Sequence, residues 1–222
     1  MDDQNHILSF QDFLSAHADI ETAFKDICHS RTYAKGSIIV SQGETDKDMF
    51  LLRKGRAKVV IYSEGGNEIH LAELKPGTLF GEMAILLNAA RSSNVAAQVS
   101  CSLESVSAHD FNNLMKTFPE LALFMTQMLA SRLQQTSQSL FENLAFTVPQ
   151  RTYEYLLRQA VQSPADEEVF HIAPPPSVTA LSESLNVSRE ATSRAITKLI
   201  SQGLVKKEKA LWKILRPNFK AS

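Results

Sequence analysis

Short β-rich runs, broken by glycine at regular intervals, fill residues 35–106 and constrain the fold more than any other feature of the chain. The runs include "GSIIVSQG", "MFLLRKG" and "AKVVIYSEGG". Branched and aromatic side chains favour strands, and glycine supplies the turns between them. No helical pattern alternates with these runs, which argues against a parallel α/β sheet. The pattern therefore predicts an antiparallel β-barrel or sandwich.

Helical patterns flank this segment on both sides. Before it, Ile20, Phe24 and Ile27 recur at helical spacing. After it, residues 107–146 contain no glycine, and Pro119 is placed to begin a long helix. Within that helix a 4-3-4-4 spacing, typical of a coiled-coil seam, relates Leu129, Leu133, Thr136, Leu140 and Leu144. The helix could pack on its own β-domain, but a small barrel buries a long helix poorly, so we favour a dimer seam.

The segment "FTVPQ" interrupts the helical pattern. Thr147 can cap a following helix and Pro149 can occupy its first turn. Residues 162–177 form a polar, proline-rich loop or a short hairpin that carries the acidic triplet 166–168. The sequence thus predicts a β-domain with N-terminal helices over residues 1–117, a long helix with a hinge over 118–146, and a separate domain over 147–222.

Two short helices with a tight turn follow in "SVTALSESLNVSREATSRAITKLISQGLV". Ser177 and Ser188 can cap them, and Asn186 tolerates the left-handed conformation that the turn needs. The second helix should bury Ile196, Leu199 and Ile200. This is the pattern of a helix-turn-helix, whose second helix reads DNA. The lysine-rich "GLVKKEKALWKIL" after it predicts a β-wing suited to phosphate contacts.

The distribution of charge agrees with a nucleic-acid-binding C-terminus. Residues 188–222 carry nine Lys and Arg against two Glu, whereas the rest of the chain has a net charge of −8. Such asymmetry indicates a basic surface on an acidic body. A basic solvated tail is the alternative, but the capped helix and the basic wing favour DNA binding.

Other classes of protein receive little support. No apolar run approaches the ~20 residues of a transmembrane helix, and "MDDQNHILSF" lacks the basic region of a secretory signal. We therefore expect a cytoplasmic protein without a membrane partner, with Cys28 and Cys101 as free thiols. We find no nucleophile–base pair and no metal-ligand spacing, and so expect neither an enzyme nor a metal site.

The stretch "GEMAILLNAARSS" places one acid and one base at the two ends of an apolar run. Glu82 and Arg91 could form a salt bridge with each other, or they could hold the two ends of one ligand. Residues 83–87 between them suit a short helical turn. Spacing alone leaves both readings open.

The ordered set of "KGSIIVSQGE", "FGEMAILLNAARSS", "SRLQQTSQSLFENLAF" and "VSREATSRAITKLISQGLV" resembles the CRP/FNR superfamily of bacterial transcription regulators, and most closely its cAMP-binding branch. The resemblance implies an α+β fold with an N-terminal antiparallel β-roll, similar to a jelly roll, that binds a cyclic nucleotide. It also implies a long dimerisation helix, a C-terminal winged helix-turn-helix, and a homodimer that binds double-stranded DNA and RNA polymerase.

The resemblance also implies roles for single residues. Glu82 would bind the ribose 2′-hydroxyl of cAMP and Arg91 the cyclic phosphate, and the helix segment "SRLQQTS" would contact the base. The implied ligand set is Gly81, Glu82, Met83, Ala84, Arg91, Ser92, Ser93, Arg132, Thr136 and Ser137. One extra residue between "TS" and "NLAF", relative to the best-known member, affects the register near Phe141.

In the second short helix "SREATSR" matches the cAMP-receptor pattern, which implies recognition of a TGTGA-like palindrome. The implied DNA-binding set is Ser188, Arg189, Glu190, Thr192, Arg194 and Lys198. Other signals stay open as alternatives: haem bound by His70 or His109, a redox signal at either cysteine, another metabolite, or no ligand at all.

Overall fold

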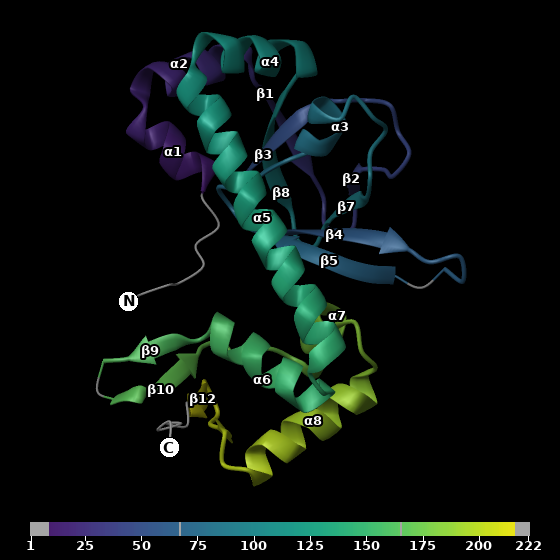
Figure 1. The fold of residues 1–222 in the computed structure, drawn as a ribbon, viewed down its shortest axis with the longest axis vertical. Helices are drawn as coiled ribbons and strands as arrows, with labels where there is room; N and C mark the ends of the chain where they lie inside the picture. The colour runs from purple at the N-terminus through teal and green to yellow at the C-terminus, as the bar shows by residue number, and fades with distance from the viewer. Residues whose placement is uncertain (1–8, 67, 165, 216–222) are drawn as a thin grey trace. The chain divides into compact units, whose positions relative to one another are not determined.

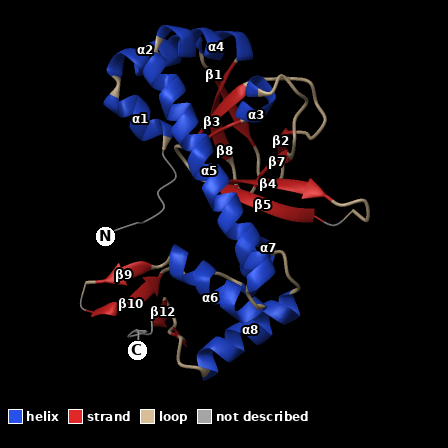
Figure 2. Cartoon of the chain, in the orientation of Figure 1, coloured by secondary structure: helices blue, strands red, loops and turns tan. Residues whose placement is uncertain are grey.

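The structure is a computed structural model that describes residues 9–66, 68–164 and 166–215. The chain divides into two compact units, one up to Thr136 and one from Ser137 onward. Figures 1 and 2 show the elements of each unit. The division falls within the 27-residue helix α5 (Pro119–Ala145). Among the described residues, no helix is both long enough and apolar enough to cross a membrane.

Two four-stranded sheets form the centre of the first unit, and every strand pairing in them is antiparallel. One sheet has the strand order β1 (His29–Tyr33), β8 (Cys101–Val106), β3 (Met49–Lys54), β6 (Leu79–Phe80). The other has the order β2 (Ile38–Val40), β7 (Asn94–Ala97), β4 (Ala57–Tyr62), β5 (Glu68–Leu74). The antiparallel sandwich predicted from the glycine-punctuated runs is confirmed.

Strand β3 shows how the sequence builds two cores on the two faces of one sheet. Successive side chains of a strand point to opposite faces. Phe50 and Leu52 therefore enter the core between the sheets, while Met49 and Leu51 enter a second core beneath the helices. All four are buried, so the run reads as continuously apolar rather than alternating.

The second core is closed by helices that lie together around α5 in Figure 1. These are α1 (Phe10–Ala16), α2 (Ala18–Ile27) and α4 (Ala108–Thr117). The N-terminal helical pattern is confirmed as two helices. At the start of α4, the Ser107 hydroxyl accepts a hydrogen bond from the Asp110 amide at 3.1 Å and donates one to the Asp110 carboxylate at 2.6 Å.

Besides the end of α5, the described residues of the second unit form three helices and one antiparallel sheet. The helices are α6 (Val148–Gln159), α7 (Val178–Leu185) and α8 (Arg189–Ser201). The sheet has the order β11 (Val205–Lys207), β12 (Trp212–Leu215), β10 (Asp166–Ile172), β9 (Val161–Ser163). Thr147 forms a capping box with Gln150, as its predicted capping role requires. The first half of the predicted loop or hairpin before α7 is a hairpin, formed by β9 and β10. The predicted β-wing is the β11–β12 pair.

The outer face of α5 exposes several leucines. Leu133 is 69% exposed and Leu144 is 81% exposed, and Leu123 and Leu140 are exposed as well. Leu129 differs from them, because it is partly buried against the core beneath the helices of its own unit. The long helix therefore packs partly on its own β-domain and leaves an apolar strip uncovered.

Candidate functional site

Gly81 turns the chain between strand β6 and the short helix α3 (Glu82–Leu86) of the first unit. It has φ +89°, a backbone conformation that residues with a side chain rarely adopt. A Cβ at this position would lie 2.9 Å from the Asp48 carbonyl oxygen and 3.0 Å from Arg91 Nη1. The turn needs glycine both for its conformation and for this close approach. The short helical turn predicted over residues 83–87 is confirmed as α3 and its C-terminal cap.

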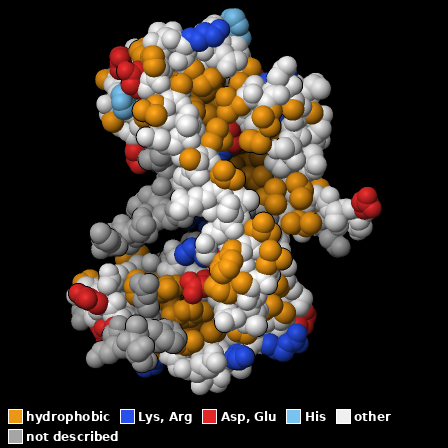
Figure 3. Space-filling view, viewed as in Figure 1, with side chains coloured by type: hydrophobic (Ala, Val, Ile, Leu, Met, Phe, Trp, Pro, Cys, Tyr) orange, Lys and Arg blue, Asp and Glu red, His pale blue; other side chains and the backbone are white. Residues whose placement is uncertain are grey.

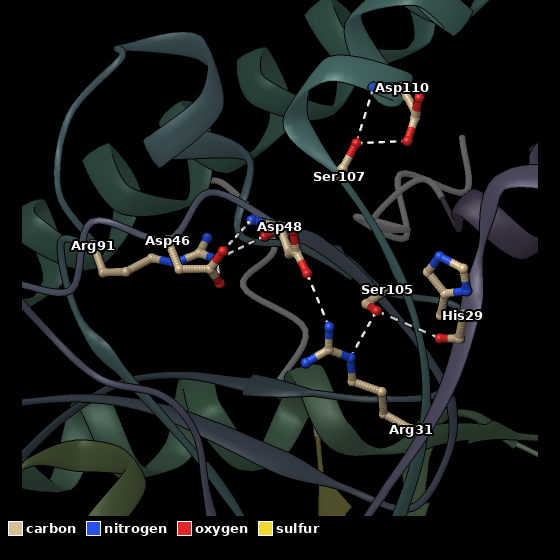
Figure 4. Close-up of polar contacts among 8 residues, drawn as sticks. All are labelled: His29, Arg31, Asp46, Asp48, Arg91, Ser105, Ser107 and Asp110. Carbon is tan, nitrogen blue, oxygen red and sulfur yellow. Dashed lines mark hydrogen bonds and ion pairs between the residues drawn. The ribbon is translucent and has the colours of Figure 1, made fainter.

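Arg91 lies beneath this turn, and its side chain is only 3% exposed. Nη1 donates to the Gly81 carbonyl oxygen at 3.2 Å, and Nη2 donates to the Asp48 carbonyl oxygen at 2.8 Å. Nη2 also pairs with Asp46 Oδ2 at 3.1 Å (Figure 4). The guanidinium carbon lies 5.7 Å from the centre of the Phe50 ring, within the range of a cation–π contact.

One polar atom of Arg91 is left over. Nε is buried and has no hydrogen-bond partner among the described residues. Leaving a buried donor unsatisfied costs about 1–3 kcal/mol, and a guanidinium binds a phosphate through two parallel N–H bonds. The residues around Gly81 and Arg91 therefore fit the phosphate of a cyclic nucleotide, which would accept the remaining donor.

Glu82 is 5% exposed and pairs with a residue of α5. Arg132 Nη1 donates to Glu82 Oε1 at 2.6 Å, and Arg132 Nη2 donates to the Leu79 carbonyl oxygen at 2.5 Å. The hypothesis that Glu82 and Arg91 form a salt bridge with each other is wrong for this structure, because each has a different partner. Buried carboxylates need a paired charge, and here the long helix supplies it.

The structure places the remaining predicted ligand residues around these two ion pairs or along α5. Ala84 is buried, whereas Met83 and Ser92 are exposed and Ser93 is half-buried. The Thr136 hydroxyl donates to the Arg132 carbonyl oxygen at 2.9 Å, and the neighbouring Ser137 is exposed. Direct contacts thus join Gly81 to Arg91 and Glu82 to Arg132.

Sequence reasoning missed Asp46 and Asp48, which lie against Arg91. Figure 4 shows both acids beside its guanidinium, and the Asp48 carboxylate pairs with Arg31 at 3.1 Å. Burial, reinforced by the negative charge of Asp46, raises the pKa of Asp48, although Arg31 and Arg91 act in the opposite direction. The acids precede Arg91 by more than forty positions, so only the pairing of the folded backbone brings them together. The sole sequence signal was their place in a loop just after Gly43.

A second site lies in the unit from Ser137 onward, on the helix-turn-helix. The Ser177 and Ser188 hydroxyls accept the amides of Ala180 and Ala191, both at 3.1 Å, and Asn186 turns the chain at φ 51°. These caps and the turn residue are as predicted. Figure 3 shows Lys and Arg side chains gathered over the α8 side of this unit.

The start of α8 presents most of the predicted DNA-binding residues. The exposed members are Ser188, Arg189, Glu190, Arg194 and Lys198. Three of them, with Val178 and Ser193, line a shallow hollow of about 450 Å³. Hydrogen bonds from its own backbone amide and from Ser188 hold the pKa of Glu190 below its ordinary value. Its carboxylate therefore stays an acceptor at neutral pH.

Two residues of α8 differ from the predictions. Thr192 was expected to contact DNA, but its side chain is fully buried and donates to the Ser188 carbonyl oxygen at 3.0 Å. It supports the first turn of the helix and presents no surface to a nucleic acid. Ile200 was expected in the buried stripe but is 40% exposed, because the core beneath α8 ends at Leu199.

The two cysteines are free. Cys101 is buried, with its sulfur 3.2 Å from the Arg56 carbonyl oxygen. Burial and the nearby Glu104 carboxylate raise the pKa of Cys28. A raised pKa lowers the fraction of reactive thiolate. Among the described residues, no group of three or more His, Cys, Asp or Glu side chains could hold a metal ion.

Comparison with known proteins places these sites in a family. Residues 30–118 match the family model of the cyclic nucleotide-binding domain, and residues 150–218 match that of the Crp-like helix-turn-helix domain. The chain is 29% identical over 184 residues to the cAMP-activated global transcriptional regulator CRP of Salmonella typhimurium, with 82% of this chain and 87% of the relative covered.

Solved structures show the same fold at lower sequence identity. A CooA mutant from Carboxydothermus hydrogenoformans aligns with a TM-score of 0.77 and 16% identity, covering 94% of this chain and 92% of CooA. The c-di-GMP responsive global regulator CLP of Xanthomonas campestris aligns with a TM-score of 0.72 and 18% identity, covering 90% of this chain and 100% of CLP. With a cyclic nucleotide-binding domain followed by a Crp-like helix-turn-helix, the chain belongs to the CRP/FNR superfamily of DNA-binding transcription regulators.

Proposed function

We propose that this protein is a homodimeric transcription regulator whose affinity for a TGTGA-like palindrome is controlled by cAMP bound in the β-roll. The observation that carries the proposal is the buried guanidinium of Arg91, whose Nη1 lies beside the Gly81 turn and whose Nε has no hydrogen-bond partner among the described residues. A guanidinium has the geometry to bind a phosphate through two parallel N–H bonds, and the free Nε supports this role. The identity to cAMP-activated relatives favours cAMP among phosphate-bearing effectors.

Arg132 connects the proposed effector site to the long helix. It comes from α5, and it reaches both Glu82 and the carbonyl oxygen of Leu79. Any ligand hydroxyl that binds Glu82 must therefore share this carboxylate with a side chain of the proposed dimer helix. Ligand binding at Glu82 can therefore change the contact between Glu82 and Arg132 and so alter the position of α5. Allosteric control requires a contact of this kind, which differs between the bound and free states.

Calorimetric titration with cAMP, cGMP and c-di-GMP tests the effector. We expect the tightest binding for cAMP and its loss in Arg91→Ala. Arg56→Ala is the matched control, since Arg56 is an exposed arginine of the same unit, and we expect it to bind as the parent protein does. Tighter binding of cGMP or c-di-GMP would reassign the effector, and binding of none of them would contradict the proposal.

The proposed DNA site is the exposed start of α8. Arginine can bond guanine through two parallel hydrogen bonds, and an ionised Glu190 can accept from cytosine N4. We expect Arg189→Ala to weaken binding to a TGTGA palindrome by about 1–3 kcal/mol and to relax specificity at one base. Lys206→Ala on the wing should instead weaken binding to all sequences alike. Fluorescence anisotropy with cognate and scrambled duplexes, with and without cAMP, separates the two effects.

The proposed dimer is supported by the exposed strip on α5. Positions 123, 126, 130, 133, 137, 140 and 144 recur at alternating spacings of three and four, and all seven are exposed. This register shares Leu133, Leu140 and Leu144 with the predicted seam, while Leu129 and Thr136 lie beside it. Four of the seven positions are leucines, and exposed apolar side chains at heptad spacing form the surface that a parallel coiled coil buries.

RNA polymerase is proposed as the protein partner, in the cytoplasm. The strand β10 begins with three exposed acids, Asp166, Glu167 and Glu168. Charged residues on an exposed strand end are available for a transient contact. Pull-down of polymerase by the DNA-bound protein, compared with a variant carrying Asn and Gln at these three positions, tests this contact.

A further inference from the structure

We propose that Asp46 competes with the phosphate of the effector for the guanidinium of Arg91 and thereby sets the effector concentration at which the β-roll is filled. The proposal rests on the proposed cyclic-nucleotide site. It adds to that site a residue whose contact opposes ligand binding rather than supporting it.

The geometry of the guanidinium makes the competition direct. Nε–H and one N–H of Nη2 point to the same side and form the fork that binds an oxyanion with two parallel bonds. Nε has no hydrogen-bond partner among the described residues, whereas Nη2 donates to Asp46 Oδ2 at 3.1 Å and to the Asp48 carbonyl oxygen at 2.8 Å. A phosphate that takes both arms of the fork must share Nη2 with these acceptors.

Of the two acceptors, only Asp46 can leave at low cost. The Asp48 carbonyl belongs to the backbone just before β3 and cannot move without the strand. The Asp46 carboxylate is a side chain with 58% exposure. Its Oδ1 also accepts a hydrogen bond from the Asp48 amide, but this bond is long at 3.4 Å, so the carboxylate can rotate into water. We therefore expect Asp46, and not Asp48, to give way when a phosphate binds.

The loop that carries Asp46 is held against Arg91 by the backbone. The Gly43 amide donates to the Arg91 carbonyl oxygen at 2.9 Å, and the Arg91 amide donates to the Glu44 carbonyl oxygen at 2.9 Å. Even when its carboxylate has rotated away, Asp46 stays near the phosphate. Two like charges at close range repel each other, so displacement and repulsion both weaken phosphate binding.

The test compares two substitutions that remove the same charge from the same loop. Asp46→Asn removes the carboxylate that contacts Arg91, while Asp48→Asn removes one that pairs with Arg31. Calorimetric titration with cAMP should show roughly two- to fivefold tighter binding for Asp46→Asn, the size expected for a partly exposed ion pair, and a clearly smaller change for Asp48→Asn. Asp46→Glu, which keeps the charge, should bind no more tightly than the parent protein.

Inorganic phosphate supplies a readout that does not depend on the nucleotide. We expect a larger phosphate-induced rise in Tm for Asp46→Asn than for the parent protein, with the Tm values in phosphate-free buffer confirming that both are folded. If the parent protein binds no cyclic nucleotide, the proposed function fails and the phosphate shift alone decides the role of Asp46. Equal or weaker anion binding by Asp46→Asn would show that Asp46 orients Arg91 and would overturn the proposal.

Discussion

At the residue scale, Gly81 combines a backbone conformation that only glycine adopts easily with crowded surroundings. Its φ is +89°, and a Cβ would lie within about 3 Å of a backbone oxygen and of Arg91 Nη1. A non-glycine residue in such a conformation costs of order 1–3 kcal/mol. The crowding adds to this cost because the nearest atom belongs to the backbone at Asp48 and cannot move aside easily.

We therefore expect Gly81→Ala to lower the free energy of unfolding by about 2–4 kcal/mol, the strain and the contact together. Gly36→Ala is the matched control, since Gly36 has φ +84° but no atom within 4 Å of the added Cβ. Gly36→Ala should lower the free energy of unfolding by the backbone strain alone, about 1 kcal/mol. Urea denaturation of both variants measures the difference, and equal losses would mean that the close approach contributes nothing.

Cys28 offers a prediction with a pH dependence. Its pKa is raised, first by burial and then by Glu104, and the thiolate is the reactive form. Its alkylation by iodoacetamide should be slower than that of a free model thiol at neutral pH and should reach its plateau at higher pH. Because the thiol loses its proton as the pH rises through its pKa, a raised pKa shifts thiolate formation to higher pH. Alkylation at neutral pH as fast as that of the model thiol would contradict this and revive the redox alternative.

At the scale of elements, the start of α8 shows why a helix cap can be predicted from neighbouring residues in the sequence. The Ser188 hydroxyl satisfies the amide of Ala191, which has no partner inside the helix. We expect Ser188→Ala to destabilise the protein by about 1 kcal/mol, as measured by thermal unfolding. Ser193→Ala serves as the control, since Ser193 is an exposed serine within the same helix. A loss in the control as large as that in Ser188→Ala would argue against the cap.

The elements that the sequence predicted well are those whose signals are local. The glycine-punctuated strands, the caps at Ser177 and Ser188, and the turn at Asn186 depend on neighbours a few positions away. The contacts that escaped prediction depend on packing between distant segments. Thr192 lies on the inner face of α8 despite its polar side chain, because its hydroxyl finds a backbone acceptor within the helix. Asp46 meets Arg91 only through the folded loop, and Glu82 finds Arg132 only because α5 lies over the β-roll.

At the scale of the whole molecule, the exposed face of α5 is the feature that a single chain leaves unsatisfied. Leu133 is 69% exposed and Leu144 is 81% exposed. Burying one leucine side chain contributes about 1.5–3 kcal/mol, so a pair of such helices gains enough from Leu123, Leu133, Leu140 and Leu144 of each chain to offset the entropy of association. Palindromic DNA also requires two recognition helices related by a two-fold axis.

We therefore expect the protein to sediment as a dimer and Leu133→Glu to sediment as a monomer, because the substitution places two like charges in an apolar seam. Sedimentation equilibrium over a range of concentrations should show a dissociation constant raised at least about hundredfold, a size consistent with unpaired buried charge. Gln135→Glu is the control, since it adds the same charge two positions away at a half-buried site outside the heptad register, and it should stay dimeric. The monomeric variant should keep its fold by circular dichroism and lose affinity for a palindrome far more than for a single half-site. A dimeric Leu133→Glu protein, or dissociation of both variants alike, would mean that the two copies meet through another surface.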